Sequence, residues 1–242
     1  MRRLRISALT ALALWATLSL DLERVALAQE ATDGHAPGGA VRGTVRVLRS
    51  LPLLGLRESE DRSGAVVYLT GLIDRAAAQV AYLNQHDERF DPRILPVVAG
   101  QTVAFPNRDP IYHNVFSVSP IQPFDLGQYK SSDPPRSVVF EHAGLVTVYC
   151  NIHPQMISYV VVLENGAFAV TDRAGAFAIE AIPPGDYTAN AWIPGAQRVS
   201  QPVHVDAGGG AALAFELRQT ERVGPHKRKD GSDYPKPRYG DE

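Results

Sequence analysis

The sequence predicts an all-β chain built from sandwiches or barrels. Short stretches rich in Val, Ile, Phe and Tyr are separated by Gly, Pro and Asp, the residues that end strands. Apolar and polar residues alternate over 43–47 and 199–205, as expected for strands with one buried face. Because no long segment carries the period of an amphipathic helix, the pattern favours packed sheets.

The expected strands follow one another along the chain, and residues 73–80 are the only candidate for a short helix. The segments predicted to form strands are 41–48, 65–69, 79–83, 94–98, 102–105, 112–118, 137–141, 145–150, 157–163, 167–170, 176–179, 187–192, 199–205 and 211–217.

The N-terminal segment has the features of a cleaved export signal. Three arginines among the first five residues precede an apolar run over 6–20, and an Ala-x-Ala cleavage site ends at Ala28. The apolar run is shorter than the ~20 residues that span a bilayer, so no stable membrane anchor is expected. We therefore expect residues 1–28 to be a signal peptide and the protein to be periplasmic. The export route, general or twin-arginine, and an uncleaved amphipathic anchor stay open.

Composition narrows the class of protein. Cys150 is the only cysteine, so no internal disulfide can form and stability must come from apolar cores. The formal net charge of −2 indicates that nucleic acid is not a partner. From Arg218 onwards the chain has seven basic and five acidic residues and almost no aliphatic ones, which predicts a disordered tail over 219–242.

One motif carries chemistry. Cys150 and Met156 are the only sulfur-containing residues apart from Met1, and His153 lies midway between them in a C-x-x-H-x-x-M motif. A thiolate, an imidazole and a thioether on one short loop form a soft ligand set. With a second imidazole from elsewhere they match a His₂Cys trigonal site with a long axial Met, the arrangement of blue copper. The motif therefore predicts a copper electron-transfer site.

The second histidine ligand has to come from another strand. His113 lies at a predicted loop-to-strand junction, and the strands expected over 137–141 and 145–150 can return the chain to it. It is the best placed of the seven histidines. His86, within a polar stretch, is a candidate for a second, weak metal site.

The segment 79–164 resembles the cupredoxins, small Greek-key copper sandwiches, and most of all their amicyanin and plastocyanin branch. Exported bacterial proteins called methylamine utilization proteins are similar over more of this segment. The shared motifs are G-x-x-V-x-F-x-N over 100–107, FPN-x-D over 105–109, HNVFS over 113–117, FDLGxY over 124–129, Tyr149-Cys150, and CNIH over 150–153.

This resemblance implies one type 1 copper ion with His113, Cys150 and His153 as equatorial ligands and Met156 as the axial ligand. It also implies that Asn114 ties the ligand strands together and hydrogen-bonds near the sulfur, which tunes the metal. The implied partners are periplasmic redox proteins. The ring edge of His153 is expected to lie at the surface. An apolar collar is expected around it, formed by Pro110, Ile111, Pro154, Ile121 and Pro123.

The flanking segments resemble a second family. The motifs TD-x-x-G-x-F over 171–177 and PPG-x-Y over 183–187 are similar to those of carboxypeptidase regulatory-like domains, which are seven-strand, transthyretin-like sandwiches. The opening motifs of that family stand before the copper segment, within 41–72. After a linker over 29–40, we therefore expect a cupredoxin sandwich (73–164) inserted between two parts of a regulatory-like sandwich (41–72 and 165–218). The alternative is that 41–69 adds strands to the cupredoxin sandwich and the two sandwiches are simply joined.

Three classes of function compete. An electron carrier between periplasmic partners accounts for the ligand motif. A multicopper oxidase or reductase needs histidines beside the cysteine, where Tyr149 and Asn151 stand, and a binuclear copper site needs two cysteines, so the chain is not expected to be an enzyme. The remaining alternative is a copper-binding, glycan-binding or protein-binding module without electron transfer. A carbohydrate or protein contact of the second sandwich is implied only by fold analogy.

Overall fold

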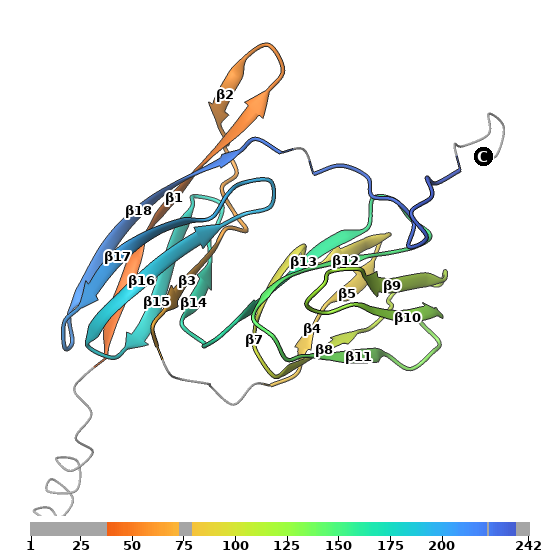
Figure 1. The fold of residues 1–242 in the computed structure, drawn as a ribbon, viewed down its shortest axis with the longest axis horizontal. Coiled ribbons are helices and arrows are strands. Elements are labelled where there is room, and N and C mark those ends of the chain that lie inside the picture. The colour runs from red at the N-terminus through yellow and green to blue at the C-terminus, as the bar shows by residue number, and fades with distance from the viewer. Residues whose placement is uncertain (1–37, 73–78, 222, 236–242) are drawn as a thin grey trace, which may run out of the picture. The chain divides into compact units, whose positions relative to one another are not determined.

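The computed structural model describes residues 38–72, 79–221 and 223–235, and within them the chain is all-β (Figure 1). The all-β prediction is therefore confirmed. Among these residues no helix is long and apolar enough to cross a membrane. The signal peptide and most of the candidate helix lie outside the described residues. The strands are β1 (Gly39–Leu51), β2 (Gly55–Glu58), β3 (Val66–Thr70), β4 (Ala81–Tyr82), β5 (Asn84–His86), β6 (Arg89–Asp91), β7 (Ile94–Val98), β8 (Gln101–Phe105), β9 (His113–Ser117), β10 (Phe124–Tyr129), β11 (Arg136–Phe140), β12 (Gly144–Tyr149), β13 (Ile157–Leu163), β14 (Phe168–Val170), β15 (Ala176–Ile182), β16 (Gly185–Trp192), β17 (Val199–Val205) and β18 (Gly210–Gln219).

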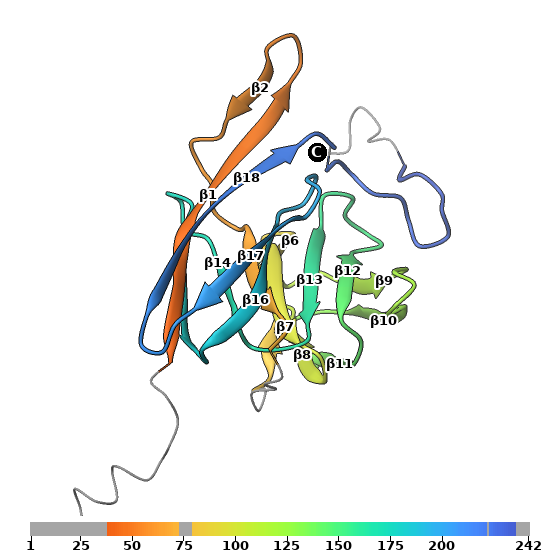
Figure 2. The same cartoon turned by 60° about the vertical axis from the view of Figure 1, so that its left-hand side comes forward.

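Strands from the early and the late parts of the chain form one two-sheet sandwich, here called the split sandwich (β1–β3 and β14–β18; Figures 1 and 2). One sheet has the order β15-β1-β18 with β2 beside β1, and the other has the order β14-β3-β16-β17. β1 runs parallel to β18 over ten residue pairs, from Ala40↔Gly210 to Arg49↔Gln219. Val45 and Val47, two residues apart on β1, are both buried in the core of this sandwich, because successive strand residues point to opposite faces.

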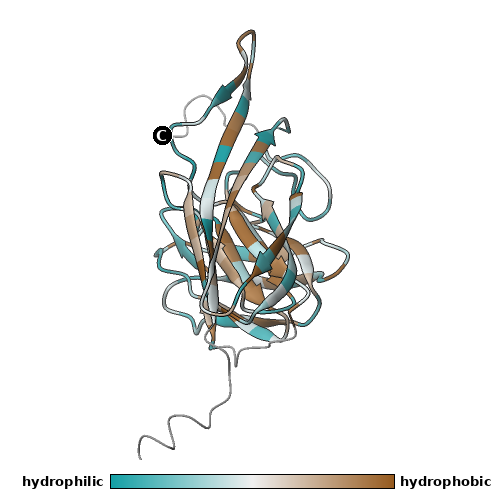
Figure 3. Ribbon diagram, turned by 90° about the vertical axis from the view of Figure 1, so that its left-hand side faces the viewer, coloured by the Kyte–Doolittle hydropathy of each residue, from teal (hydrophilic) through white to brown (hydrophobic). Residues whose placement is uncertain are grey.

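The strands between them form the central sandwich (β4–β13). Its larger sheet has the order β10-β9-β12-β13-β7, its smaller sheet has the order β11-β8-β4, and β5 pairs with β6 in a hairpin. Hydrophobic residues are concentrated on the strands, where they are interrupted by hydrophilic ones, and much of the loop backbone is hydrophilic (Figure 3). The core of the central sandwich contains Phe105, Phe140 and Val148, and it also contains Cys150 and Met156. The two sulfur residues of the motif therefore lie inside an apolar core.

Four strands had no signal in the sequence: β2, β5, β6 and β10. β10 contains Asp125 and Gly127, which usually end strands. Here its pairing with β9 shifts register between Asp125 and Gln128, and Gly127 has φ 68°, as expected for a β-bulge. The β5–β6 turn uses Asp87 and Glu88 at φ 50° and 53°, where Asn-Gly is the usual sequence signal.

The end of the chain also differs from its sequence pattern. Composition predicted a disordered tail, but residues 223–235, here called the C-terminal segment, run from the split sandwich to the central sandwich (Figures 1 and 2). His226 packs there against the rings of Tyr149 and Phe116. The segment has few aliphatic residues, so it is held by aromatic packing and hydrogen bonds instead. Composition alone does not predict such contacts.

Candidate metal centre

Two neighbouring strands and one loop carry the candidate ligands. His113 opens β9, and Cys150 follows the last residue of β12, the strand beside β9. Residues 150–156, here called the ligand loop, lead from there to β13 and carry His153 and Met156. Two backbone hydrogen bonds close the loop: Cys150 N–H donates to the Met156 carbonyl at 3.3 Å, and Met156 N–H donates to the His153 carbonyl at 3.1 Å.

The donor atoms of the two histidines and the cysteine converge on one point. The Nδ1 atoms of His113 and His153 are 3.0 Å apart, and the Cys150 Sγ lies 3.7 Å from Nδ1 of His153. The three possible ligand atoms all lie within 4.8 Å of one another. The side chains of His113 and Cys150 are fully buried, whereas that of His153 is 18% exposed. Two imidazoles and a thiol at these distances suit a soft metal ion.

The fourth predicted ligand, Met156, is fully buried in the same core. Its carbonyl accepts the hydrogen bond from Cys150 N–H, so both sulfur residues belong to one closed turn of chain. Blue copper sites combine a His₂Cys set with a weak, long axial Met, and Met156 is the buried thioether that this loop offers. The residues present therefore fit copper with a His₂Cys set and an axial Met.

The pKa of the Cys150 thiol lies below its ordinary value. Burial raises the pKa, but hydrogen bonds to the sulfur from His113 and from the backbone N–H groups of Asn114, Ile152 and His153 outweigh it. The Ile152 nitrogen lies 3.4 Å from Sγ. These donors stabilise the thiolate, which is the form that binds metal.

The side chain of Asn114 bonds to Asp125 rather than to the sulfur of Cys150. Its Nδ2 donates to Oδ1 of Asp125 at 2.8 Å, which links β9 to β10. The resemblance implied that Asn114 ties the ligand strands together near the sulfur. Its backbone N–H is one of the groups that lower the pKa of Cys150. Asn114 therefore links β9 to β10 through its side chain and stabilises the thiolate through its backbone, where the resemblance had implied a single link between the ligand strands.

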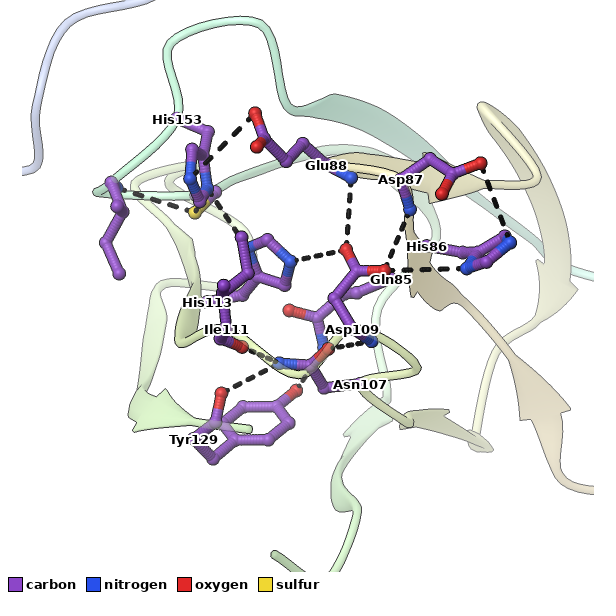
Figure 4. Close-up of polar contacts among 12 residues, drawn as sticks. Gln85, His86, Asp87, Glu88, Asn107, Asp109, Ile111, His113, Tyr129 and His153 are labelled. Carbon is purple, nitrogen blue, oxygen red and sulfur yellow. Dashed lines mark hydrogen bonds and ion pairs between the residues drawn. The ribbon is translucent and has the colours of Figure 1, made fainter. Parts of the chain in front are cut away.

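Asp109 is a residue of the centre that the sequence reasoning missed. Its Oδ2 lies 2.7 Å from Nε2 of His113, and its two oxygens also accept the backbone N–H groups of Asp87 and Glu88 at 2.9 and 3.0 Å (Figure 4). Burial raises the pKa of Asp109, but these hydrogen bonds lower it more, so the carboxylate stays ionised. The only signal for this residue was its place in the FPN-x-D motif.

This carboxylate also sets which nitrogen of His113 faces the sulfur. In the neutral ring that would bind a metal, the single proton lies on Nε2 and donates to Asp109, so Nδ1 has its lone pair free. The protonated ring of the metal-free protein can donate from both nitrogens, to Asp109 and to the Cys150 sulfur. Burial lowers the pKa of His113, but hydrogen bonds to Cys150 and Asp109 raise it more, so its net pKa lies above the ordinary value. For His153, burial is the main cause and its pKa is lowered.

His86 lies beside this network rather than apart from it. Its Nδ1 is 3.5 Å from Oδ1 of Asp109 and its Nε2 is 3.6 Å from Oδ2 of Asp87 (Figure 4). The predicted second metal site would thus share Asp109 with His113. His86 and Asp87 are exposed, which leaves Asp109 as the only buried member of the cluster.

The expected apolar collar is wrong in part. Ile111 is 42% exposed two residues before His113. Ile121 instead lies beside Gly144, which begins β12, whereas Cys150 follows the other end of that strand. Pro123 precedes Phe124, which pairs with Ser117 at the end of β9 farther from His113. The loop over 118–123 turns away from the ligands, so Ile121 and Pro123 do not surround His153.

Among solved structures, the chain is similar to a purple cupredoxin and to several amicyanins. No family model matches the chain, and no curated protein does. A purple cupredoxin from Nitrosopumilus maritimus is 25% identical with a TM-score of 0.31, over 34% of this chain and 99% of that chain. Amicyanin from Paracoccus versutus is 21% identical with a TM-score of 0.33, over 40% of this chain and 97% of that chain. The reduced state of an amicyanin mutant is 25% identical with a TM-score of 0.32, over 41% of this chain and 99% of that chain.

Proposed function

We propose that this chain is an exported type 1 copper protein that transfers single electrons between periplasmic redox partners. The observation that supports it is the convergence of Nδ1 of His113, Sγ of Cys150 and Nδ1 of His153, with Met156 buried beside them. Copper held there would supply a one-electron Cu(I)/Cu(II) couple.

The protein residues have separate tasks in this proposal. Cys150 lies in the apolar core of the central sandwich and His113 is fully buried, which excludes water from the thiolate. Asp109 holds the ring of His113, and the backbone N–H of Ile152 holds the sulfur. The partly exposed ring of His153 provides the route by which an electron leaves or arrives. A protein that transfers electrons without binding a substrate at the metal needs no open coordination position. The four proposed ligands would leave none.

Titration of the purified protein with Cu(II) tests the proposal. A Cu(II)–thiolate bond gives intense visible absorption, so the loaded protein should be strongly coloured and should lose the colour reversibly on one-electron reduction. The Cys150→Ser variant should lack the visible absorption band even where it still binds Cu(II), because the thiolate is both a ligand and the chromophore. His142→Asn, at an exposed histidine outside the cluster, is the matched control and should keep the band. A wild type that binds copper with Cys150 reduced and stays colourless would contradict the proposal.

The split sandwich is proposed to be a carboxypeptidase regulatory-like module, and two of its motifs support that. Oδ1 of Asp172 accepts the N–H of Ala176 at 2.8 Å across the turn of TD-x-x-G-x-F, where Gly175 has φ 82°. In PPG-x-Y, the Tyr187 hydroxyl donates to the Pro183 carbonyl at 2.8 Å. We also propose that this module binds a carbohydrate or a protein. Calorimetric titration with oligosaccharides tests carbohydrate binding.

Export is proposed from the leader alone. Fractionation of cells that express the full chain should place the protein in the periplasm. Its N-terminal sequence there should begin near Gln29, and retention of residues 1–28 on membranes would contradict cleavage.

A further inference from the structure

The C-terminal segment touches the ligand loop along most of its length. The Tyr234 hydroxyl donates to the carbonyl oxygen of Cys150 at 2.6 Å. The Lys229 backbone N–H donates to Oδ1 of Asn151 at 2.8 Å. Farther along the loop, the His226 backbone N–H lies 3.4 Å from the Pro154 carbonyl. All three contacts come from 223–235, and the one from Tyr234 reaches Cys150 itself.

A cluster of rings joins the same segment to both ligand strands. The His226 ring centroid lies 4.5 Å from that of Tyr149 and 6.2 Å from that of Phe116. Tyr149 and Phe116 are the residues through which β12 and β9 pair. Tyr234 packs edge-on against His226 with centroids 5.5 Å apart, which holds its hydroxyl toward Cys150. The segment therefore sits over the junction of the two strands that bear His113 and Cys150.

One carboxylate extends the contact toward His113. Nζ of Lys229 lies 2.5 Å from Oδ2 of Asp125, whose Oδ1 accepts the side-chain amide of Asn114. Burial raises the pKa of Asp125, but the bonds from Lys229, Asn114 and the Gly127 N–H lower it more, so it is ionised. An exposed ion pair of this kind contributes little energy, but here it orients the segment next to the residue that follows His113.

We propose that the C-terminal segment is a clamp that positions the ligand loop, with Tyr234 and His226 as its positioning residues. This rests on the proposed copper function. The loop has only two backbone hydrogen bonds of its own that close it. A metal site binds well when surrounding groups hold its ligands near their bound geometry before the ion arrives. The clamp adds three hydrogen bonds to the loop and an aromatic contact to the strands that flank it, so the loop would lose less conformational entropy on binding.

Hydrogen exchange of the metal-free full-length protein tests the clamp without any copper. In Tyr234→Phe, which removes only the hydroxyl, the Ile152 and Met156 amides should exchange about fivefold faster, the effect of losing one hydrogen bond of roughly 1 kcal/mol. His226→Ala should accelerate the same amides at least as much. Tyr82→Phe is the matched control, because Tyr82 is 56% exposed on β4, outside the clamp, and its exchange should equal wild type.

Copper-loaded protein gives a second readout. Release of copper to a chelator should be faster in Tyr234→Phe by a similar factor of about five, because the loop opens more often. Unchanged exchange at Ile152 and Met156 in both clamp variants would overturn the proposal. Acceleration spread evenly over the whole central sandwich would also overturn it, since the segment would then stabilise the fold and not the loop. Failure to bind copper would refute the copper function while leaving the exchange result valid.

Discussion

Oδ2 of Asp109 lies 2.7 Å from Nε2 of His113, while Nδ1 of the same ring lies 3.0 Å from Nδ1 of His153. The buried histidine is thus held between a carboxylate and the candidate metal position. Carboxylates in this position orient a ligand imidazole and raise its basicity.

Replacing Asp109 with Asn should weaken copper binding by about 10- to 100-fold, the usual effect of removing the group that orients a ligand histidine. The physical reason is that an amide is a weaker acceptor than a carboxylate for the His113 N–H. A competition titration with a chelator measures the change. Asp87→Asn is the control, because the Asp87 side chain is 80% exposed and contacts His86 rather than a ligand. Equal affinities for the two variants would show that the Asp109 contact does not support the site.

Met156→Leu should keep copper and colour but change the reduction potential, since the axial ligand tunes it. The two side chains have similar volume, so the free energy of unfolding of the metal-free protein should fall by less than about 1.5 kcal/mol. Voltammetry of the loaded variant and denaturant unfolding of the metal-free variant measure the two effects. An unchanged potential would mean that the thioether does not contact the ion.

Replacing Ile111 with Glu should slow electron exchange with the physiological partner while leaving the visible spectrum nearly unchanged. Ile111 is 42% exposed close to His113, and a charge there would have to be desolvated in a small, brief carrier interface. Pro154→Glu, next to His153, should act in the same direction.

Ile121→Glu is the matched control, because Ile121 is 37% exposed but lies at the end of β12 away from Cys150. Stopped-flow mixing with the partner measures all three variants. Equal slowing by Ile111→Glu and Ile121→Glu would indicate a general charge effect instead of a docking edge at His153.

Gly43→Ala should destabilise the split sandwich by about 3 kcal/mol, at the upper end of ordinary point mutations. A Cβ on Gly43 would collide with the backbone carbonyl of Leu213, where β1 runs beside β18. Gly210→Ala, in the same strand pair, is the control because its Cβ would meet its nearest atom at 3.9 Å. Thermal unfolding of both variants measures the difference. Equal unfolding midpoints for the two variants would show that β1 and β18 can accommodate a Cβ at Gly43 without a loss of stability.

Sequence motifs were sufficient to predict the donor chemistry of the candidate centre. Cys150, His153 and Met156 lie within seven residues, so their types and spacing indicate a soft metal site without any knowledge of the fold. Strands such as 157–163 and 199–205 were also predictable, because alternation and β-branched residues are local signals. The motifs likewise pointed to His113 as the distant second histidine.

Other features depended on tertiary structure. Asp109 lies in a loop with no periodic sequence pattern, so its contact with His113 was not predictable. Strand β10 was missed because it contains Asp125 and Gly127, which usually end strands but here belong to a β-bulge. The C-terminal segment has a composition typical of disorder, yet Tyr234 bonds to Cys150 across 84 positions of the sequence. Local propensity describes each residue in its own neighbourhood, whereas such contacts arise only when β9 and β12 pair and offer Tyr149 and Phe116 to a distant ring. The sequence by itself therefore determined which side chains are candidate metal ligands, because their types and spacing are local features, and the tertiary structure decided which contacts hold those side chains together.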